Sequence, residues 1–274
     1  MSLTQQERAL RFRALHENGS VFVIPNPWDV ASARILDGLG FPALATSSAA
    51  SACALGRRDG ELSREDALAH ARMIVNATDL PVSADLEKGF GDAPEIVAET
   101  VRLAAEAGLV GCTIEDATGD PHRPLYAFSL AVERIAAAVE SARSLSFPFL
   151  LTARAHNLMF ANPSLDETIE RLQAFERAGA DVLFAPGLPD INAVRAVCAA
   201  VSKPVNFMVG IKGKSFSVPE LASAGVRRVS LATSLYRAAM TGFLNAAFEV
   251  KNSGHFGFVD TSVSTQELLK LMRA

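Results

Sequence analysis

The sequence predicts an α/β protein built as a (β/α)8 TIM barrel with an additional C-terminal helical segment. Three observations support this prediction. Short apolar or β-branched runs recur along the chain, a helical pattern separates each run from the next, and glycines join several of these helices directly to the following run. Eight strands alternating with eight helices form such a barrel. An open doubly wound sheet is the alternative, but eight strands close more naturally.

The predicted strands are the apolar runs themselves, and they cover residues 21–25, 43–46, 81–86, 110–115, 149–154, 181–186, 204–209 and 228–232. The helical patterns between them include residues 63–77, 94–107, 129–144 and 164–178. Capping residues open some of these helices, as in Ser63-Arg64-Glu65-Asp66 and Asn162-Pro163-Ser164. Glycine, which adopts the left-handed C-cap conformation at low steric cost, is expected to end the helices at Gly40, Gly108, Gly179 and Gly225.

The two ends of the chain are predicted to be helical. Residues 1–19 read as an amphipathic helix rather than a signal peptide, because they lack an apolar central region. No linker or shift in composition divides the chain, so residues 1–274 are predicted to form one domain with 233–274 as a C-terminal helical extension. The last helix is expected at 264–273. This extension is long for a helix that only closes a barrel, which leaves it free to dock on a neighbouring subunit.

Composition excludes several classes of function. The 274 residues are 49% hydrophobic, enough for a sizeable core, and the net charge of −4 comes without a basic tract of the kind that binds nucleic acid or anionic membrane. No uncharged apolar run reaches the roughly 18 residues that a membrane span needs. The three cysteines have no metal-ligand or redox spacing, so a reducing cytoplasm is the expected compartment.

Polar residues cluster where the predicted strands end, which is the end of a TIM barrel that carries the chemistry. Successive strands and their loops contribute Thr46, Ser47 and Ser48, then Asp59, then Asp85 and Glu87, then Glu115 and Asp116, then Arg154 and His156, and finally Asn206. We therefore place the candidate site at this rim.

Four of the carboxylates, Asp59, Asp85, Glu87 and Glu115, are expected to converge on one sector of the rim without matching lysines. Carboxylates that close repel one another, and a hard divalent cation removes the repulsion. Oxygen ligands favour Mg2+ or Mn2+ over zinc, and Mg2+ commonly contacts only one or two carboxylates directly. A single pair of acids after a strand ordinarily belongs to a solvated loop or a helix N-cap. Here, however, acids occur together at the ends of adjacent strands, which favours a metal site.

The other residues of the rim each have two interpretations. Arg154 lies in an apolar strand, where a buried arginine needs a partner, so it either pairs with Glu115 or Asp116 or grips a substrate carboxylate. His156 either caps a loop or takes part in catalysis. Ser47 and Ser48 are either ordinary turn residues or hydroxyl and backbone N–H donors to a substrate carboxylate. The predicted substrate-binding set is Thr46, Ser47, Ser48, Asp59, Arg154 and Asn206.

At this point the chain resembles the isocitrate lyase/phosphoenolpyruvate mutase superfamily. The resemblance runs from about Ile24 to Tyr236, and its carriers are PNPWDVASAR, LATSS, LGRRDG, SADLEKGFGD, TIEDATGD, TARAHN and ELASAGVRRVSLA. It implies a Mg2+-dependent barrel whose ligands, direct or through water, match Asp59, Asp85, Glu87 and Glu115. It also implies that Ser47, Ser48, the metal and Arg154 hold a two-carbon oxo-acid end of the substrate, and that the chains form a helix-swapped homotetramer.

The departures from the family pattern narrow the function. Glu87 stands where aspartate is common, so a shifted or water-mediated coordination is expected. The K-K-C-G-H loop of isocitrate and methylisocitrate lyases is replaced by ATGDPHRPLY, without cysteine, and Pro186-Gly187 replaces their glutamate after strand six. Those two activities are therefore not expected. The phosphonate-forming mutases use a lysine and an asparagine in this loop, which here offers only His122 and Arg123.

These features predict a lyase that cleaves a carbon–carbon bond of a 2-oxo or 2-hydroxy (di)carboxylate through a metal-stabilised enolate, with oxaloacetate-like substrates the simplest. Arg154 would stabilise the developing charge, loop 117–126 would close to exclude water, and His122 or His156 would supply a proton. Mutase or phosphonopyruvate hydrolase chemistry on a P–C bond is one alternative, and a non-catalytic dicarboxylate-binding barrel is another. A phosphate-binding barrel would need glycine-rich turns, for which residues 210–214 are only a faint match.

Overall fold

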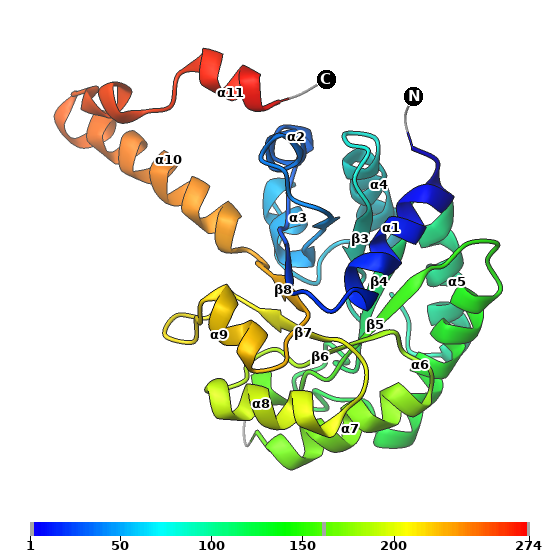
Figure 1. The fold of residues 1–274 in the computed structure, drawn as a ribbon. Helices are drawn as coiled ribbons and strands as arrows, with labels where there is room; N and C mark the ends of the chain where they lie inside the picture. The colour runs from blue at the N-terminus through cyan, green and yellow to red at the C-terminus, as the bar shows by residue number, and fades with distance from the viewer. Residues whose placement is uncertain (1–2, 161–162, 273–274) are drawn as a thin grey trace.

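The computed structural model describes residues 3–160 and 163–272 and shows eight parallel strands that form a nearly closed barrel (Figure 1). The strands are β1 (Phe22–Ile24), β2 (Leu44–Ala45), β3 (Val82–Asp85), β4 (Gly111–Glu115), β5 (Leu150–Arg154), β6 (Val182–Phe184), β7 (Val205–Met208) and β8 (Arg228–Ser230). Their order is β1-β8-β7-β6-β5-β4-β3-β2. The backbone N–H of Ala45 donates to the carbonyl of Pro25 at 3.0 Å, which joins the two ends of the sheet.

Helices follow the strands and surround the barrel. They are α2 (Val30–Gly38), α3 (Ser48–Ala54), α4 (Arg64–Val75), α5 (Pro94–Glu106), α6 (Phe128–Arg143), α7 (Leu165–Arg177), α8 (Ile191–Ala200) and α9 (Val218–Ser223), with a 3-10 turn η1 (Asn157–Met159) after β5. Each of the eight predicted strands is confirmed, and the TIM barrel is the observed fold. The open-sheet alternative is wrong, because β1 pairs with β8 and the hydrogen bond from Ala45 to Pro25 joins the end strands β1 and β2.

The predicted helix signals also hold where the structure describes them. Ser63 caps α4 in a reciprocal box with Asp66, and Ser164 caps α7 by accepting from the backbone N–H of Glu167. Asn162, the first residue of that second signal, lies outside the described residues. All four predicted C-cap glycines have positive φ, between 84° and 100°. Local capping chemistry therefore sets where the helices begin and end.

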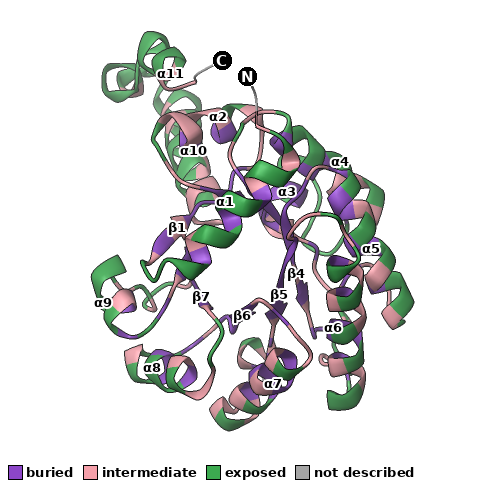
Figure 2. Ribbon diagram, turned by 45° about the vertical axis from the view of Figure 1, so that its right-hand side comes forward, coloured by how far each residue is buried: buried purple, intermediate pink, exposed green. Residues whose placement is uncertain are grey.

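The core fills the barrel and the space beneath the helices, and Figure 2 shows the strands buried inside a ring of half-exposed helices. The N-terminal helix α1 (Gln5–Glu17) covers the end of the barrel where the strands begin. Its Ala9 and Phe12 are fully buried and pack in one cluster with Phe22, Val110 and Leu150. This plug leaves the opposite end, where the carboxylates lie, as the open mouth.

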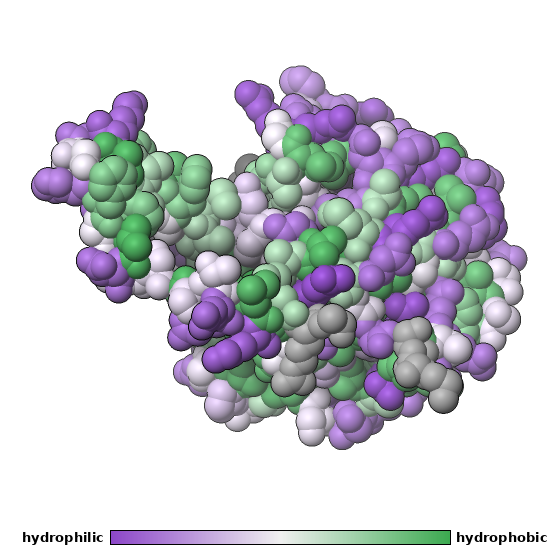
Figure 3. All heavy atoms as spheres, turned by 90° about the horizontal axis from the view of Figure 1, so that it is seen from above, coloured by the Kyte–Doolittle hydropathy of each residue, from purple (hydrophilic) through white to green (hydrophobic). Residues whose placement is uncertain are grey.

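The C-terminal extension leaves the barrel as an arm. It consists of α10 (Ser234–Ser253), a 3-10 turn η2 (Gly257–Thr261) and α11 (Thr265–Leu271), and Figure 1 shows α10 pointing away from the barrel. None of the α10 residues is buried. The arm exposes large apolar side chains, namely Phe243, Leu244, Phe248, Phe256 and Val259. Figure 3 shows hydrophobic surface on a part of the molecule that stands off from the rest. The last helix was predicted to reach Arg273, which lies outside the described residues.

Within residues 3–160 and 163–272, no helix is both long enough and apolar enough to cross a bilayer.

Candidate active site

Three charged residues of the predicted site are the last residues of adjacent strands. Asp85 ends β3, Glu115 ends β4 and Arg154 ends β5. The sheet register pairs Glu115 directly with Arg154, and Asp85 with Thr113 two residues earlier on β4. Because the strands are parallel, these side chains emerge together at the carboxyl end of the barrel.

Arg154 lies between the two carboxylates. Its Nη1 is 3.1 Å from Oε2 of Glu115 and 3.7 Å from Oδ2 of Asp85, and the three side chains are only 14–19% exposed. The guanidinium also lies over the ring of Phe184, 5.2 Å from its centroid. Its buried Nε has no hydrogen-bond acceptor in the described part of the chain. The ion pair expected with Glu115 is therefore present, and one donor of the guanidinium is still free for a ligand.

Hydroxyl groups from the β2–α3 junction surround Asp85. Thr46 accepts from the backbone N–H of Asp85 at 3.1 Å, and the hydroxyl of Ser48 donates to Oδ2 of Asp85 at 3.2 Å. Ser47 is the N-cap of α3, where its side chain accepts from the backbone N–H of Ala50. The short helix α3 was not expected from its small residues. It begins at these serines, and so it aims backbone N–H groups at the mouth of the barrel.

The carboxylates of the rim influence one another electrostatically. Burial, followed by the charges of Asp85, Asp59 and Glu115, raises the pKa of Glu87 to about 7. Burial also raises the pKa of Asp85, although Arg154 opposes this. At Glu115 burial acts in the same direction, but Arg154 and His156 outweigh it and the pKa is lowered. Negative charge on Asp85 and Glu87 is thus incompletely balanced by the residues around them.

The donor set fits a Mg2+ ion better than a metal held entirely by protein. Within residues 3–160 and 163–272, no three His, Cys, Asp or Glu side chains are arranged as a ready-made metal cluster. Mg2+ does not need one, because it retains several waters and takes one or two carboxylates together with substrate oxygens. Asp85 and Glu87 can supply such carboxylate oxygens. Their pKa values are raised, and a bound cation would favour their ionised forms. Asp59 is exposed in the α3–α4 loop and acts on them through its charge.

The two histidines predicted for catalysis lie in different settings. Nδ1 of His156 is 3.2 Å from Oε2 of Glu115, and its backbone N–H donates to Asp116 at 2.7 Å. His122 is exposed at the tip of the β4–α6 hairpin, residues 117–126, whose strands meet at the Ala117–Leu125 bridge. The structure therefore brings His156 into the charged group and leaves His122 outside it.

A narrow cavity of about 50 Å³ lies inside the mouth and is lined by Thr46, Ser47, Asp85, Arg154 and Asn206 among others. Among the lining residues that the sequence did not predict are Asn26 and Arg228. Asn26 donates to the carbonyl of Thr46 and accepts from the backbone N–H of Leu231, which fixes the β1 and β8 ends together. Arg228 is buried and donates to Asn206 and Thr152. The signal that singled out Arg154, an arginine inside an apolar strand, also applies to Arg228.

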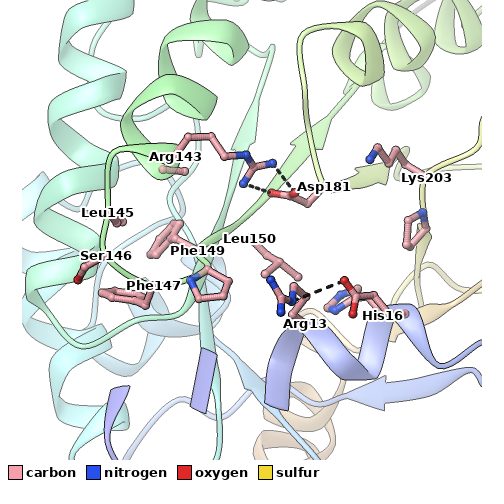
Figure 4. Close-up of a pocket in the computed structure, with 14 residues that line it drawn as sticks. Arg13, His16, Arg143, Leu145, Ser146, Phe147, Phe149, Leu150, Asp181 and Lys203 are labelled. Atoms are coloured by element: carbon pink, nitrogen blue, oxygen red, sulfur yellow. Dashed lines mark hydrogen bonds and ion pairs between the residues drawn. The ribbon is translucent and has the colours of Figure 1, made fainter. Parts of the chain in front are cut away.

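A larger hollow of about 510 Å³ lies at the opposite end of the barrel, between α1 and the segments that enter β5, β6 and β7 (Figure 4). Its charged side chains are largely engaged with one another. Arg143 pairs with Asp181 at 2.5 Å, and Arg13 lies 3.6 Å from Glu17. The carboxylates of the rim and Arg154 are absent from its lining. We therefore place the active site at the smaller cavity, where unbalanced charge and polar strand ends coincide.

Comparison with known proteins identifies the family of this chain. The family model described as phosphoenolpyruvate phosphomutase matches residues 12–251, which includes every strand of the barrel. The chain belongs to the phosphoenolpyruvate phosphomutase family. Its membership of the isocitrate lyase/phosphoenolpyruvate mutase superfamily, expected from the motifs, is thereby confirmed, and the relatives of the chain are lyases and mutases.

Several relatives show the range of this family. The chain is 30% identical to a 2-methylisocitrate lyase of Shewanella oneidensis over 97% of this chain and 94% of that protein. It is 34% identical to an oxaloacetate decarboxylase of Rhodopseudomonas palustris over 68% of this chain and 66% of that protein. A solved candidate lyase/mutase from Burkholderia cenocepacia J2315 is 51% identical, covers 98% of both chains and has a TM-score of 0.96.

Proposed function

We propose that this protein is a Mg2+-dependent lyase that cleaves a carbon–carbon bond of a 2-oxo or 2-hydroxy (di)carboxylate. The observation that carries the proposal is the position of Arg154 at the mouth of a barrel of this family. Its Nη1 faces Asp85 and Glu115, while its buried Nε has no hydrogen-bond acceptor in the described part of the chain. A carboxylate substrate would satisfy the remaining guanidinium donor. Oxaloacetate is the simplest substrate of this class, and a relative that decarboxylates it covers two thirds of the chain.

Asp85 is the proposed direct ligand of the cation, with Asp59, Glu87 and Glu115 binding it directly or through water. Mg2+ when bound, or Mn2+ in its place, would supply positive charge next to the oxygen on which the bond cleavage places negative charge. Asp85 is oriented for this role by Ser48, whose hydroxyl donates to its carboxylate, and by Thr46, which accepts from its backbone N–H. Water-mediated contact suits Asp59, because this residue is exposed in its loop.

Arg154 and the residues at the start of α3 are proposed to bind the substrate carboxylate. The planar guanidinium presents several donors in a fixed fork, which matches a carboxylate. Ser47 adds a hydroxyl donor at the start of α3. The hydroxyl and backbone N–H of Ser48 donate to Oδ2 of Asp85 in this structure, and we propose that they turn to the substrate carboxylate once the cation binds Asp85. Asn206, fixed by Arg228 and Ser230, completes the polar lining on the other side of the cavity.

His156 is the proposed proton donor to the carbon that the cleavage leaves behind. Its contact with Glu115 fixes the ring through Nδ1 and leaves Nε2 for proton exchange. His122 is the second candidate, because the hairpin that carries it would bring it towards the mouth on closing. Replacing each histidine by glutamine shows which of the two is the proton donor. Only the variant that lacks the proton donor should lose the factor of about 100 or more in kcat that general acids supply.

Isocitrate and methylisocitrate are not the proposed substrates, although methylisocitrate lyases are among the relatives. The hairpin 117–126 contains no cysteine, and Pro186 and Gly187 follow β6 where those lyases carry a glutamate. The chain therefore lacks the acid that protonates their leaving group. The hairpin equally lacks the lysine and asparagine of the phosphonate-forming mutases, which favours carbon–carbon cleavage over P–C chemistry.

An NMR product screen tests the proposal. The protein is incubated with Mg2+ and, in separate samples, oxaloacetate, alkylmalates, methylisocitrate, phosphonopyruvate and phosphoenolpyruvate. Pyruvate with carbon dioxide, or a 2-oxo acid with a second acid, is the expected outcome. Interconversion of the two phosphorus compounds would replace the lyase proposal with a mutase. Binding of Mg2+ and oxalate without turnover of any compound would indicate a dicarboxylate-binding barrel instead.

The apolar arm supports a second part of the proposal, which concerns assembly. Helix α10 exposes Phe243 and Phe248 at 64% and 53% although it follows directly on the barrel. Burying side chains of this size contributes roughly 1.5–3 kcal/mol each, so a second copy of the chain is a favourable partner for the arm. A helix-swapped dimer, paired into a homotetramer, is the proposed assembly.

A further inference from the structure

Arg134 on α6 is a buried arginine whose guanidinium donates its hydrogen bonds to the backbone of one loop. It is 1% exposed and is the largest of the fully buried side chains. Its guanidinium donates to the backbone carbonyls of Lys88, Gly91 and Asp92, the second of these at 2.7 Å. No carboxylate lies within ion-pair distance of it among residues 3–160 and 163–272. An arginine buried in this way acts as a clamp on the backbone.

The clamped loop is the β3–α5 loop, which carries Glu87, and its backbone has an unusual shape. Glu87 has φ of 51° and Phe90 has φ of 62°, both in the left-handed region that residues other than glycine rarely adopt. Such conformations persist only where the surroundings hold them. Arg134 bonds to carbonyls on both sides of Phe90 and immediately after Glu87, so it supplies that restraint. The restraint fixes the backbone that carries Glu87, whose pKa is raised by burial and by the charges of the other carboxylates of the rim.

The same group of residues also joins this loop to the hairpin 117–126. The ring of Tyr126 lies under the Arg134 guanidinium at 4.1 Å, and the Tyr126 hydroxyl donates to Oδ1 of Asp92 at 2.5 Å. On the other side, Nζ of Lys88 donates to the carbonyl of Thr118 at 2.7 Å. Thr118 and Tyr126 lie near the two ends of the hairpin, so both of its strands are tied to the loop that carries Glu87.

We propose that Arg134 and Tyr126 are positioning residues that couple the metal-binding loop to the hairpin over the active site, so that cation binding and hairpin order depend on each other. Neither residue lines the cavity at the mouth of the barrel. The inference rests on the proposed function at one point only, namely that Glu87 takes part in binding the cation. A move of the hairpin would pull on Asp92 and Lys88, and through them on the backbone that orients Glu87.

Two variants test the coupling. Tyr126→Phe removes the hydroxyl that reaches Asp92 and keeps the ring under Arg134, while Arg134→Lys keeps the charge and loses the three-carbonyl geometry. Mn2+ affinity is measured by electron paramagnetic resonance, and backbone hydrogen exchange of residues 117–126 is measured with and without Mg2+. We expect Mn2+ affinity to fall about tenfold in either variant, as for other residues that orient metal ligands. We also expect Mg2+ to slow exchange in the hairpin of the unmodified protein but not in the variants.

Arg102→Met is the matched control, because Arg102 lies on the surface of α5 and pairs only with Glu106. It should change neither measurement. Melting temperatures recorded in parallel identify a variant that has simply lost its fold, in which case Tyr126→Phe, the milder change, decides. If the unmodified protein binds no Mn2+, the proposed function fails and the inference fails with it. If it binds Mn2+ and both folded variants bind equally well with unchanged exchange, only the coupling is wrong.

Discussion

Arg154 is the residue on which the electrostatics of the site depend most directly. Its guanidinium faces both Glu115 and Asp85. Together with His156 it lowers the pKa of Glu115 against the effect of burial, and at Asp85 it opposes the rise in pKa that burial causes. Lysine would keep the charge but lose the planar fork. Removing the fork therefore tests geometry rather than charge.

We predict that Arg154→Lys lowers kcat/KM by at least 100-fold in the assay with the substrate that the product screen identifies. The reason is that preorganised donors to a developing charge supply factors of this size. Arg143→Lys, at the opposite end of the barrel and half exposed, is the matched control and should leave kcat/KM unchanged. Equal activity of the two variants would remove Arg154 from the mechanism.

His16 makes a prediction about pH and stability that is independent of the active site. Burial, helped by the charge of Arg228, lowers its pKa from 6.5 to about 3. Above pH 6.5 the ring is neutral in both the folded and the unfolded chain. Between these values only the unfolded chain binds the proton, so the free energy of unfolding falls as the pH falls, by about 2 kcal/mol at pH 5.

His16→Asn isolates this contribution, since an asparagine amide can still donate to the carbonyl of Phe12 as Nδ1 does. Urea unfolding at pH 7 and pH 5 should show a smaller loss of stability on acidification in the variant than in the unmodified protein. An identical loss in both would mean that His16 is protonated inside the fold.

At the residue scale, much of the site is predictable from the sequence because the chemistry of a barrel gathers at its strand ends. Asp85, Glu115 and Arg154 lie at or next to the last residues of the strands predicted at 81–86, 110–115 and 149–154. Arg134 was not predictable, because within ERIAAAVE it looks like any surface arginine of an amphipathic helix. Only the packing of α6 against the β3–α5 loop reveals that it is buried. The separate settings of His122 and His156 likewise depend on the shape of a hairpin.

At the element scale, the sequence predicted the C-terminal ends of helices best, because glycines mark them. Gly179 and Gly40 have φ of 100° and 84°, and both hand a helix over to the next strand. They differ in their surroundings. A Cβ at Gly179 would lie 2.9 Å from Cγ1 of Val139, whereas a Cβ at Gly40 would meet nothing within 4 Å.

We predict that Gly179→Ala lowers the free energy of unfolding by about 2–3 kcal/mol and that Gly40→Ala lowers it by about 1–2 kcal/mol. The left-handed conformation costs both alanines a similar amount, and the contact with Val139 is added only at Gly179. Denaturant unfolding of the two variants measures the difference. A larger effect at Gly40 would contradict this account of the two caps.

Strand ends and short helices were the least predictable elements. The run 228–232 was expected as a strand, but only Arg228–Ser230 pairs with its neighbours, because Ala232 turns into the left-handed region at φ of 46°. Helix α3 has a sequence of small residues, SAASACA, whose periodicity carries no signal. It forms because Ser47 caps it and because Ala50 and Ala52 are buried against the barrel.

At the scale of the whole molecule, the arm formed by α10 and α11 needs a partner that the barrel alone does not supply. Figure 2 shows its outer part exposed, and Figure 3 shows apolar side chains along it. We predict that the protein sediments as a tetramer and that Phe248→Glu shifts it to smaller species, because a charge would be buried in the interface. Analytical ultracentrifugation measures both. A monomeric unmodified protein would contradict the swapped assembly.

Whole-molecule features were predictable to different degrees. The length of the extension indicated that it docks on a neighbouring subunit, since its sequence continues well beyond the eighth strand. Which helix it contacts was not predictable. In the structure α11 returns to α2, where the carbonyl of Leu271 approaches so closely that a Cβ at Gly38 would lie 1.9 Å from it.

The central claim is that a divalent cation held at Asp85 and its neighbours, together with Arg154, binds the carboxylate end of the substrate. Calorimetric titration with oxalate, which resembles the enolate of a 2-oxo acid, tests this most directly. The account predicts that oxalate binds the unmodified protein in Mg2+, fails to bind in EDTA, and fails to bind Asp85→Ala even though that variant keeps its fold by circular dichroism. Oxalate binding that is equally strong in EDTA, or that survives in folded Asp85→Ala, would contradict it.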